Sequence, residues 1–547
     1  MNFLRRIKAS LGADTAYLGA SRSAREVTGW DAGNSSADAG IEEGLETLTS
    51  RARDLDRNSG LAQNLKNTKI ENIIGVGLQW QPQPNWKVLG KTSDWAHEFA
   101  AVAKPHWNDF AKSRHFDYEG EDNFAMQSRL LYSNRFTNGA GCVVPMWLEN
   151  RPGTRYRTCF KVVESDRLSN PAKYVDINQS RISNGVERDR NGQIIRYHIR
   201  NTHPGESNVG VEGVTWEPIP AYYDNGRRGF IHVYHKDRPG QSRGVAAVSA
   251  VMAAFGIRSK YQLTELQAAD VASRIAGVME TPLSDEQAQK LFGGKSSDFS
   301  ELRKTWNGKL TSGMILKLPP GTKYQTHIPN RPATAYVGFM DHISQEIGIA
   351  VGLPDILSRR DWSKVNYSSA RGALLECWRG FYVEQSEICF QAFTPMVELW
   401  MEDAIDLGVF DDLLTLDEFY AHRSACTNGR WLGKGNQPID RLKHENANKI
   451  ALENGTTTLM DIFAEDGEDA EEKIEQSFRE KAAALRNKYR MAALEKELKV
   501  EFEVELAPEP PAPPKPEEPP PLSDEEIDKN DEEDNETNEP EEAELVE

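Results

Sequence analysis

The hydrophobic periodicity of this chain changes twice along its length, and that order of patterns limits the folds open to it. Residues 45–137 show helical spacing. Residues 140–235 then carry short β-branched or aromatic runs bounded by Gly, Pro and Asn, which are typical of strands. Helical spacing returns at Ser242 and predominates in most of the chain beyond it. The order predicts an α+β protein that is mainly helical, with a β-rich segment.

Two local signals refine this reading of the first half. Asn58-Ser59-Gly60 is predicted to separate two helices within residues 45–74, because Asn and Gly tolerate the positive φ that a helix end requires. Further helical patterns lie around residues 93–113 and 121–137. Asn191-Gly192 predicts a β-hairpin with a type I′ turn, which needs positive φ at both central residues.

The second half is predicted to contain several long helices. One starts at Ser242, with a break near Gly256, and reaches about Met279; others cover residues 333–351 and start near Tyr367. Pro395 falls inside the last pattern, where it removes a backbone hydrogen bond and crowds the preceding turn. We therefore expect a kink near residues 391–395. Residues 439–505 are predicted to be helical and highly charged.

The net charge of −19 is concentrated in the tail. Residues 507–547 hold 17 acidic residues, two lysines and 10 prolines, leaving a net charge of only −4 for the preceding 506 residues. Such a tail cannot bury enough apolar surface to offset its ordering entropy, so it is predicted to be disordered. The nearly neutral body lacks the basic footprint of an ordinary nucleic-acid binder.

Other global features favour a soluble intracellular protein. Five scattered cysteines argue against a disulfide framework. The first 19 residues lack the continuous apolar core of a secretory signal. The most apolar run, residues 244–257, is 14 residues long, whereas a membrane span needs about 20. No membrane partner is expected.

Two segments invite an enzymatic interpretation. “FGGKSS” at residues 292–297 resembles part of a phosphate-binding loop, but a Walker loop needs another Gly five positions before Gly294, where this chain has Gln289. Asp341 and Glu346 lie on one predicted helix and could form an acid–base pair, although charged residues on a solvated helix face are far commoner.

Four histidines could suggest a metal centre. His232 and His235 are three apart in a β-like stretch, so they are expected on opposite faces, which is poor ligand geometry. Ordinary strand and loop positions explain the set better: His198, His203, His232 and His235. We expect no catalytic residues, no metal and no cofactor.

A small basic cluster stands out in residues 352–366. Arg359, Arg360 and Lys364 follow a Gly-Leu-Pro break and precede a long helix. A solvated connection between two helices would explain these charges, and so would a surface that faces an anionic partner. The sequence pattern by itself leaves both explanations open.

Four segments together resemble the portal proteins of lambda-like tailed bacteriophages. Each contributes a recognisable pattern, and the four occur in family order over residues 50–490: “RARDLDRNSGLAQNLKNTKIENIIGVGLQWQPQPNW”, “FIHVYHKDRPGQSRGVAAVSAVM”, “IGIAVGLPDILSRRDWSKVNYSSARGALLECW” and “NGRWLGKGNQPIDRLKHENANKIALENGTTTLMDIFAEDGED”. The first 44 residues and the tail lie outside the resemblance.

The resemblance implies a virion protein assembled in the host cytoplasm as a ring of twelve copies at one capsid vertex. Double-stranded DNA would pass through the ring without sequence-specific contacts, driven by the terminase large subunit. Further implied partners are the major capsid and scaffold proteins and the head-completion or adaptor proteins that join the tail. Another virion ring (an adaptor or shell subunit) and, more remotely, a packaging ATPase or nuclease stay open as alternatives.

The family architecture can be mapped onto this sequence. Gly352 and Pro354 would be the hinge of the channel loop, and Arg359, Arg360 and Lys364 would contact DNA. Leu374, Trp378 and Phe381 share one helix face and would serve in packing and at the subunit interface. The implied parts are a peripheral segment 1–44, a wing 45–235, a first stem helix 242–278, a clip 279–331, a second stem helix 333–351, a channel loop 352–366, a long kinked helix 367–405, a crown 436–505 and the tail 506–547.

Overall fold

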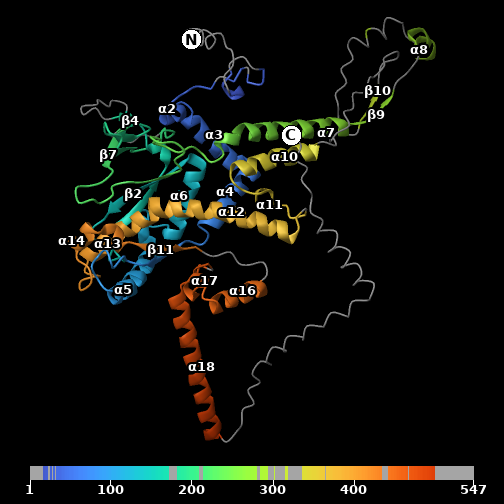
Figure 1. Cartoon of the computed structure of the whole chain (residues 1–547). Helices are drawn as coiled ribbons and strands as arrows, with labels where there is room; N and C mark the ends of the chain where they lie inside the picture. Colours follow the sequence, from blue (N-terminus) through green and yellow to red (C-terminus); the bar gives the residue numbers. More distant parts are fainter. Residues whose placement is uncertain are drawn as a thin grey trace, which may run out of the picture. The chain divides into compact units, whose positions relative to one another are not determined.

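The structure of the protein, a computed structural model, forms two compact units, Met1–Ala470 and Glu471–Glu547 (Figure 1). The acidic tail, Lys364 and most of the expected clip lie outside the described residues, so the expectations for them stay predictions. The described residues are 17–21, 25–27, 29–30, 32–171, 181–207, 213–279, 284–292, 301, 314–317, 336–363, 365–433, 441–465 and 467–498.

The expected helices of the first half are present. The predicted break is confirmed, but its reason differs: Ser59 has an extended backbone (φ −119°) and its hydroxyl accepts a hydrogen bond from the N–H of Ala62 at 3.4 Å, so it caps the following helix. Neither Asn58 nor Gly60 has a positive φ. The helices are α2 (Ala37–Glu42), α3 (Leu45–Asn58), α4 (Gly60–Ile73), α5 (Ser93–Lys112) and α6 (Phe124–Asn138).

The β-rich segment forms two antiparallel sheets, in agreement with the strand prediction for residues 140–235. One sheet has the order β3-β2-β8 and the other the order β4-β5-β6-β7. Their strands are β2 (Ala140–Trp147), β3 (Thr158–Val163), β4 (Arg181–Ser183), β5 (Val186–Arg188), β6 (Ile194–Arg200), β7 (Trp216–Pro220) and β8 (Ile231–Tyr234).

The hairpin at Asn191-Gly192 exists, but its predicted turn type is wrong. Only Gly192 has positive φ (91°), because the side chain of Asp189 closes a longer loop by accepting from the backbone N–H groups of Asn191 and Gln193 at 2.9 and 2.8 Å. The two consecutive positive φ values that a type I′ turn needs occur instead at Asn184 and Gly185, between β4 and β5.

The helix predicted to start at Ser242 starts later. Helix α7 covers Met252–Arg274, after a 3₁₀ turn at Ser249–Val251, and it continues through Gly256 without a break. The residues before α7 bind the N-terminal segment instead of forming a helix. Both the N–H and the hydroxyl of Ser242 donate to the carboxylate of Asp38 (2.7 and 2.9 Å). Asp38 on α2 is buried. This part of residues 1–44 therefore packs against the body, contrary to the peripheral position that was expected.

The helix predicted for residues 333–351 is confirmed as α10, Tyr336–Ala350. It lies beside α7 (Figure 1): the rings of Tyr261 and Tyr336 stack at 5.6 Å, and Nε of Arg258 donates to Oγ of Ser344 at 3.2 Å. Helix α7 also ends earlier than predicted, since Ile275–Met279 form strand β9, which pairs in parallel with β10 (Met314–Lys317). The described residues of the expected clip (279–331) include β10 and helix α8 (Asp285–Phe292).

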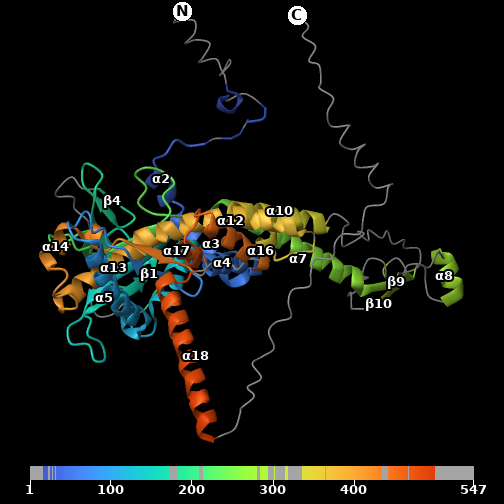
Figure 2. The ribbon, with the colours of Figure 1, turned by 60° about the horizontal axis from the view of Figure 1, so that its bottom comes forward.

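Where a kink was expected, near residues 391–395, the structure has a π-helical turn. Helix α12 (Tyr367–Ile388) passes through the π turn Cys389–Phe393 into α13 (Thr394–Asp406), and the two helices continue one another in both views (Figures 1 and 2). Pro395 has no N–H to donate to the carbonyl of Gln391, so the wider turn accommodates the missing bond.

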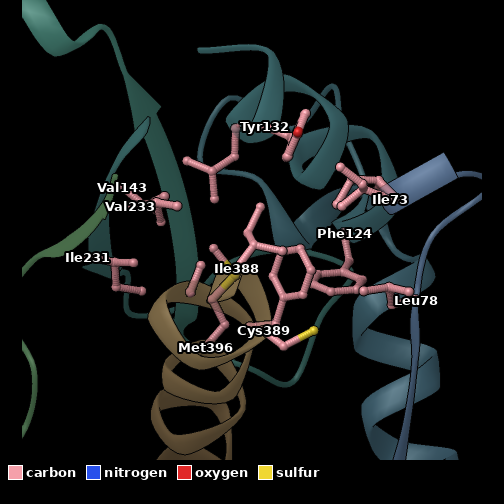
Figure 3. Close-up of a cluster of buried hydrophobic side chains, with 14 of the residues drawn as sticks. Ile73, Leu78, Phe124, Tyr132, Val143, Ile231, Val233, Ile388, Cys389 and Met396 are labelled. Atoms are coloured by element: carbon pink, nitrogen blue, oxygen red, sulfur yellow. The ribbon is translucent and has the colours of Figure 1, made fainter. Parts of the chain in front are cut away.

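The main core packs around this junction. Figure 3 shows Ile388, Cys389 and Met396 pointing toward Phe124 on α6 and toward the sheet residue Val143. A cluster of tryptophans extends the core, with centroid separations of 5.4 Å between Trp107 and Trp400 and 6.4 Å between Trp80 and Trp400. These side chains are almost fully buried and tie the N-terminal helices to the C-terminal half of the long helix.

The remaining C-terminal elements are mostly helical, as expected for residues 439–505. Strand β11 (Gly429–Leu432) returns to pair antiparallel with β1 (Gln79–Pro82). Within the described residues, none of the helices is long and apolar enough to cross a membrane. The helices are α14 (Leu416–Ala421), α15 (Arg423–Cys426), α16 (Arg441–Glu453), α17 (Leu459–Glu465) and α18 (Ala470–Leu498).

Candidate channel loop

The predicted loop starts at a glycine that ends α10. Gly352 has φ +73°, and the N–H of Leu353 donates to the carbonyl of Gly348 at 2.9 Å, as in a Schellman C-cap. Pro354 follows with φ −66° and ψ 159° and precedes a short helix, α11 (Asp355–Ser358). The proposed hinge residues therefore fix the direction in which the chain leaves α10.

Helix α11 is anchored to the body rather than held out in solvent. The side-chain amide of Asn64 on α4 donates to the carbonyls of Leu357 and Ser358 at 3.0 and 2.8 Å, which caps the C-terminal end of α11. Leu353 and Ile356 are buried. The first half of the loop is thus a packed element.

Arg359 is bound within the chain. Its guanidinium donates to both carboxylate oxygens of Asp355 and to Oδ1 of Asp341 on α10, and its side chain is only 15% exposed. The hydrogen bond from Arg359 lowers the pKa of Asp355 below its ordinary value. Arg359 therefore fastens α11 to α10, and Asp341, which the sequence offered as an acid–base candidate, is its partner.

Arg360 has a different environment. Its side chain is 59% exposed, its Nη2 atom lies 3.5 Å from Oε2 of Glu71, and its backbone takes a left-handed φ of +55°. Lys364 lies outside the described residues. Of the two described cations, Arg360 is the one available to an external anion. Asp341, Glu71 and Asn64 could not be predicted as neighbours of the loop from the sequence, because they lie on other helices.

The proposed packing residues of α12 face α4 of the same chain. Phe381 is 2% exposed, and the ammonium group of Lys69 lies 5.2 Å from the centroid of its ring. That ammonium also lies 2.5 Å from Oε1 of Glu384. Trp378 is half-buried and borders a groove of about 600 Å³, and Leu374 is half-buried as well.

The histidines of the β segment are not assembled into a metal site. Nε2 of His198 lies 2.9 Å from a carboxylate oxygen of Glu187, both buried, while His232 is buried in the other sheet. Over the part of the chain that the structure describes, no three His, Cys, Asp or Glu side chains are grouped so as to hold a metal ion. What the loop offers chemically is an exposed cation, Arg360, beside a cluster in which Arg359 faces two carboxylates.

Comparison with known proteins identifies the family. The family model described as “Phage portal protein, lambda family” matches residues 23–385, which include the whole of the loop. The chain belongs to this family. This portal protein is 27% identical to the portal protein of Escherichia phage N15 over 475 residues, covering 83% of this chain and 87% of that protein. It is 26% identical to portal protein B of Escherichia phage lambda, with the same coverage.

Solved structures similar to this portal protein come from gene transfer agent particles. A chain in the neck of a native particle, computed with C12 symmetry, is 13% identical, with a TM-score of 0.38, covering 64% of this chain and 81% of that one. A chain in the neck of an empty particle, computed with C6 symmetry, is 13% identical, with a TM-score of 0.39 over 82% of this chain and 99% of that one.

Proposed function

We propose that this protein forms a head-to-tail ring of twelve copies at one capsid vertex, through which DNA is packaged and ejected and to which the tail is joined. The observation that carries the proposal is the family match over residues 23–385. A ring of identical subunits closes by rotation when each copy presents two different, complementary faces.

Within the ring, residues 352–366 would face the DNA. Among the loop residues that the structure describes, Arg360 would be the main contact. Twelve copies would present twelve such arginines around the channel. The neighbouring cluster of Arg359 with Asp341 and Asp355 holds one cation and two carboxylates, so it would not add to the attraction of DNA. Duplex DNA carries about one charge per 1.7 Å, so a strongly basic wall would retain it, whereas isolated, screened cations would let it slide.

The family also suggests partners for this ring. The terminase large subunit would dock during packaging, the major capsid and scaffold proteins would surround the ring, and head-completion proteins would follow. The ring would assemble in the host cytoplasm and remain in the virion. Its part in packaging would be structural, with no catalysis of its own.

The experiment compares Arg360→Ser with Arg190→Ser in a phage that depends on this gene. Arg190 is exposed on the wing hairpin and serves as a matched control. We expect both variants to give rings with a central hole by negative-stain microscopy, and only Arg360→Ser to reduce the DNA packaged or retained per particle. Purified wild-type protein without rings would refute the proposed function. Normal DNA content in Arg360→Ser would refute the role of the loop.

A further inference from the structure

Helix α18, drawn in Figure 1 as one continuous helix, carries the apolar spacing of a coiled coil. Phe478, Ala482, Leu485 and Tyr489 follow one another at intervals of four, three and four residues, which is how the a and d positions of a coiled coil alternate. The three large side chains of this seam, Phe478, Leu485 and Tyr489, are 71%, 57% and 76% exposed. The seam, defined as these four residues, is therefore open to a partner.

Both flanks of the seam are cationic. In the register that places Ala482 at an a position, the e and g positions beside the seam hold only basic residues: Arg479 and Arg486 at e, and Lys481 and Lys488 at g. All four side chains are exposed. Arg479 lies 2.6 Å from Oε1 of Glu475, one turn earlier on the same helix.

This charge pattern disfavours the pairing of α18 with another copy of itself. The residues at e and g decide which helices pair in a coiled coil, and in which orientation. In a parallel pair, Lys481 at g would face Arg486 at e of the second copy. In an antiparallel pair, e would face e and g would face g, so cations would again meet cations. Like charges at these positions act against association.

We propose that residues 478–489 of α18 form a short coiled coil with an acidic amphipathic helix of a different protein. The partner helix would place large apolar residues against the seam, and Glu or Asp opposite the cations on its two flanks. An interface of this length is small, so the contact would be transient. The inference goes beyond the proposed function and does not depend on it.

Other occupants match the seam less well. Duplex DNA would attract the flanking cations but offers them phosphates only, and the seam would stay uncovered. At about 100° per residue the four seam residues fall within about 60° of the helix circumference, the narrow stripe of a coiled coil rather than the apolar face of a helix lying on a membrane. The acidic tail of this chain has only Leu522 and Ile527 as large apolar residues between Pro521 and Pro540, too few to fill the seam.

The first test titrates the full-length protein into three labelled synthetic peptides, each several heptads long. One has Leu at a and d with Glu at every e and g position, the second has Lys in place of Glu, and the third is the Glu peptide in scrambled order. Fluorescence anisotropy should show at least tenfold tighter binding of the Glu peptide than of the other two. Equal binding of the three peptides, or no binding of the Glu peptide, would overturn the inference.

The second test exchanges one flanking charge. Arg486→Glu should weaken the Glu peptide at least threefold and strengthen the Lys peptide. Arg490→Glu is the matched control, because it makes the same change of charge at an exposed b position outside the interface, and it should alter neither affinity. Equal effects of the two substitutions would mean that net charge alone attracts the peptide. Tighter binding of a short DNA duplex, or of vesicles containing phosphatidylserine, than of the Glu peptide would likewise overturn the inference.

The third test separates a foreign partner from a second copy of this chain. Leu485→Glu places a charge in the seam, so it should abolish binding of the Glu peptide while rings form at wild-type yield in negative-stain images. Loss of rings in this variant would show that copies of this chain cover the seam, against the inference. A wild-type protein without rings that still binds the Glu peptide would contradict the proposed function alone.

Discussion

Gln391 satisfies both backbone groups of Tyr234 at the end of β8. The N–H of Tyr234 donates to Oε1 of Gln391 at 3.0 Å, and Nε2 of Gln391 donates to the Tyr234 carbonyl at 3.1 Å. One side-chain amide thus takes the place of a neighbouring strand at the edge of the sheet. Because Gln391 lies in the π turn, this contact joins the long helix to the wing.

Removing this amide should loosen the end of β8. Gln391→Leu keeps the side-chain size but leaves two half-buried backbone groups without their partner, at a cost of about 1–2 kcal/mol. Hydrogen exchange of the peptide containing Tyr234 should accelerate, while Gln476→Leu on the exposed face of α18 should leave it unchanged. Unchanged protection in the Gln391 variant would show that water replaces the amide at no cost.

The two described arginines of the loop should differ in their effect on stability. Arg359→Ser breaks charge-assisted bonds to two helices and should cost about 1–3 kcal/mol. Arg360→Ser removes an exposed charge and should stay within about 0.5 kcal/mol. Thermal melting of each variant checks the difference. Equal melting temperatures would mean that the Arg359 cluster adds nothing to the fold. We therefore expect that replacing Arg359, Arg360 and Lys364 together by Ser would also destabilise the fold, through the loss of Arg359.

His232 should make the wing sensitive to acid. Neither ring nitrogen has a hydrogen-bond partner among the described residues, and burial, then Arg243 and Arg188, holds the pKa of His232 well below its ordinary value near 6.5. The unfolded state therefore binds a proton at a pH where the folded state does not, so stability falls as pH drops below about 6.5, by about 1.4 kcal/mol per pH unit.

His232→Phe removes the proton site while keeping an aromatic ring that can stack on Tyr234, where the ring centroids are now 4.4 Å apart. The melting temperature of the variant should fall less between pH 7 and pH 5 than that of the wild type. Parallel pH profiles for the two proteins would assign the acid sensitivity to other groups.

Replacing Gly244, which precedes α7, and Gly256, which lies inside α7, by alanine should have opposite effects on stability. A Cβ atom at Gly244 would lie 2.2 Å from the carbonyl oxygen of Gly139, so Gly244→Ala should severely reduce the yield of folded protein. Gly256 lies inside α7 with nothing within 4 Å, so Gly256→Ala should stabilise the helix by about 0.5–1 kcal/mol. Soluble yield and melting temperature check both, and a normal Gly244→Ala protein would contradict the close packing.

Trp378 and Phe381 should not be equally costly to truncate. Phe381→Ala removes a buried ring and should cost about 3–5 kcal/mol. The position of Trp378 on the same helix face predicts, from the sequence alone, a similar cost for Trp378→Ala. Because Trp378 is only half-buried beside an open groove, we now expect a smaller loss than for Phe381→Ala. Denaturant titration of both variants shows which one loses more free energy of unfolding.

The sequence by itself determined which kind of element most of the described segments form, although residues 242–248 and Ile275–Met279, predicted to be helical, are not. The helix break at Ser59, the irregular turn before Pro395 and the β-rich character of residues 140–235 depend on local spacing and backbone chemistry. The family could also be recognised from the sequence, because its motifs are contiguous stretches of residues. The DNA contact of Lys364 and the disorder of the acidic tail remain predictions, because these residues lie outside the described part of the structure.

Only the tertiary structure decided which side chains meet. Arg359 pairs with Asp341, 18 residues away on another helix, and that contact separates a structural cation from the exposed Arg360. Helix α7 begins at Met252 instead of Ser242, and in the segment before it Arg243 donates to the carbonyl of Leu168, 75 residues earlier. Periodicity indicates that a helix has an apolar face, but the residues that cover that face depend on long-range packing. In α12 that packing buries Cys377, Phe381 and Ile388 and leaves Leu375, Tyr382 and Val383 exposed.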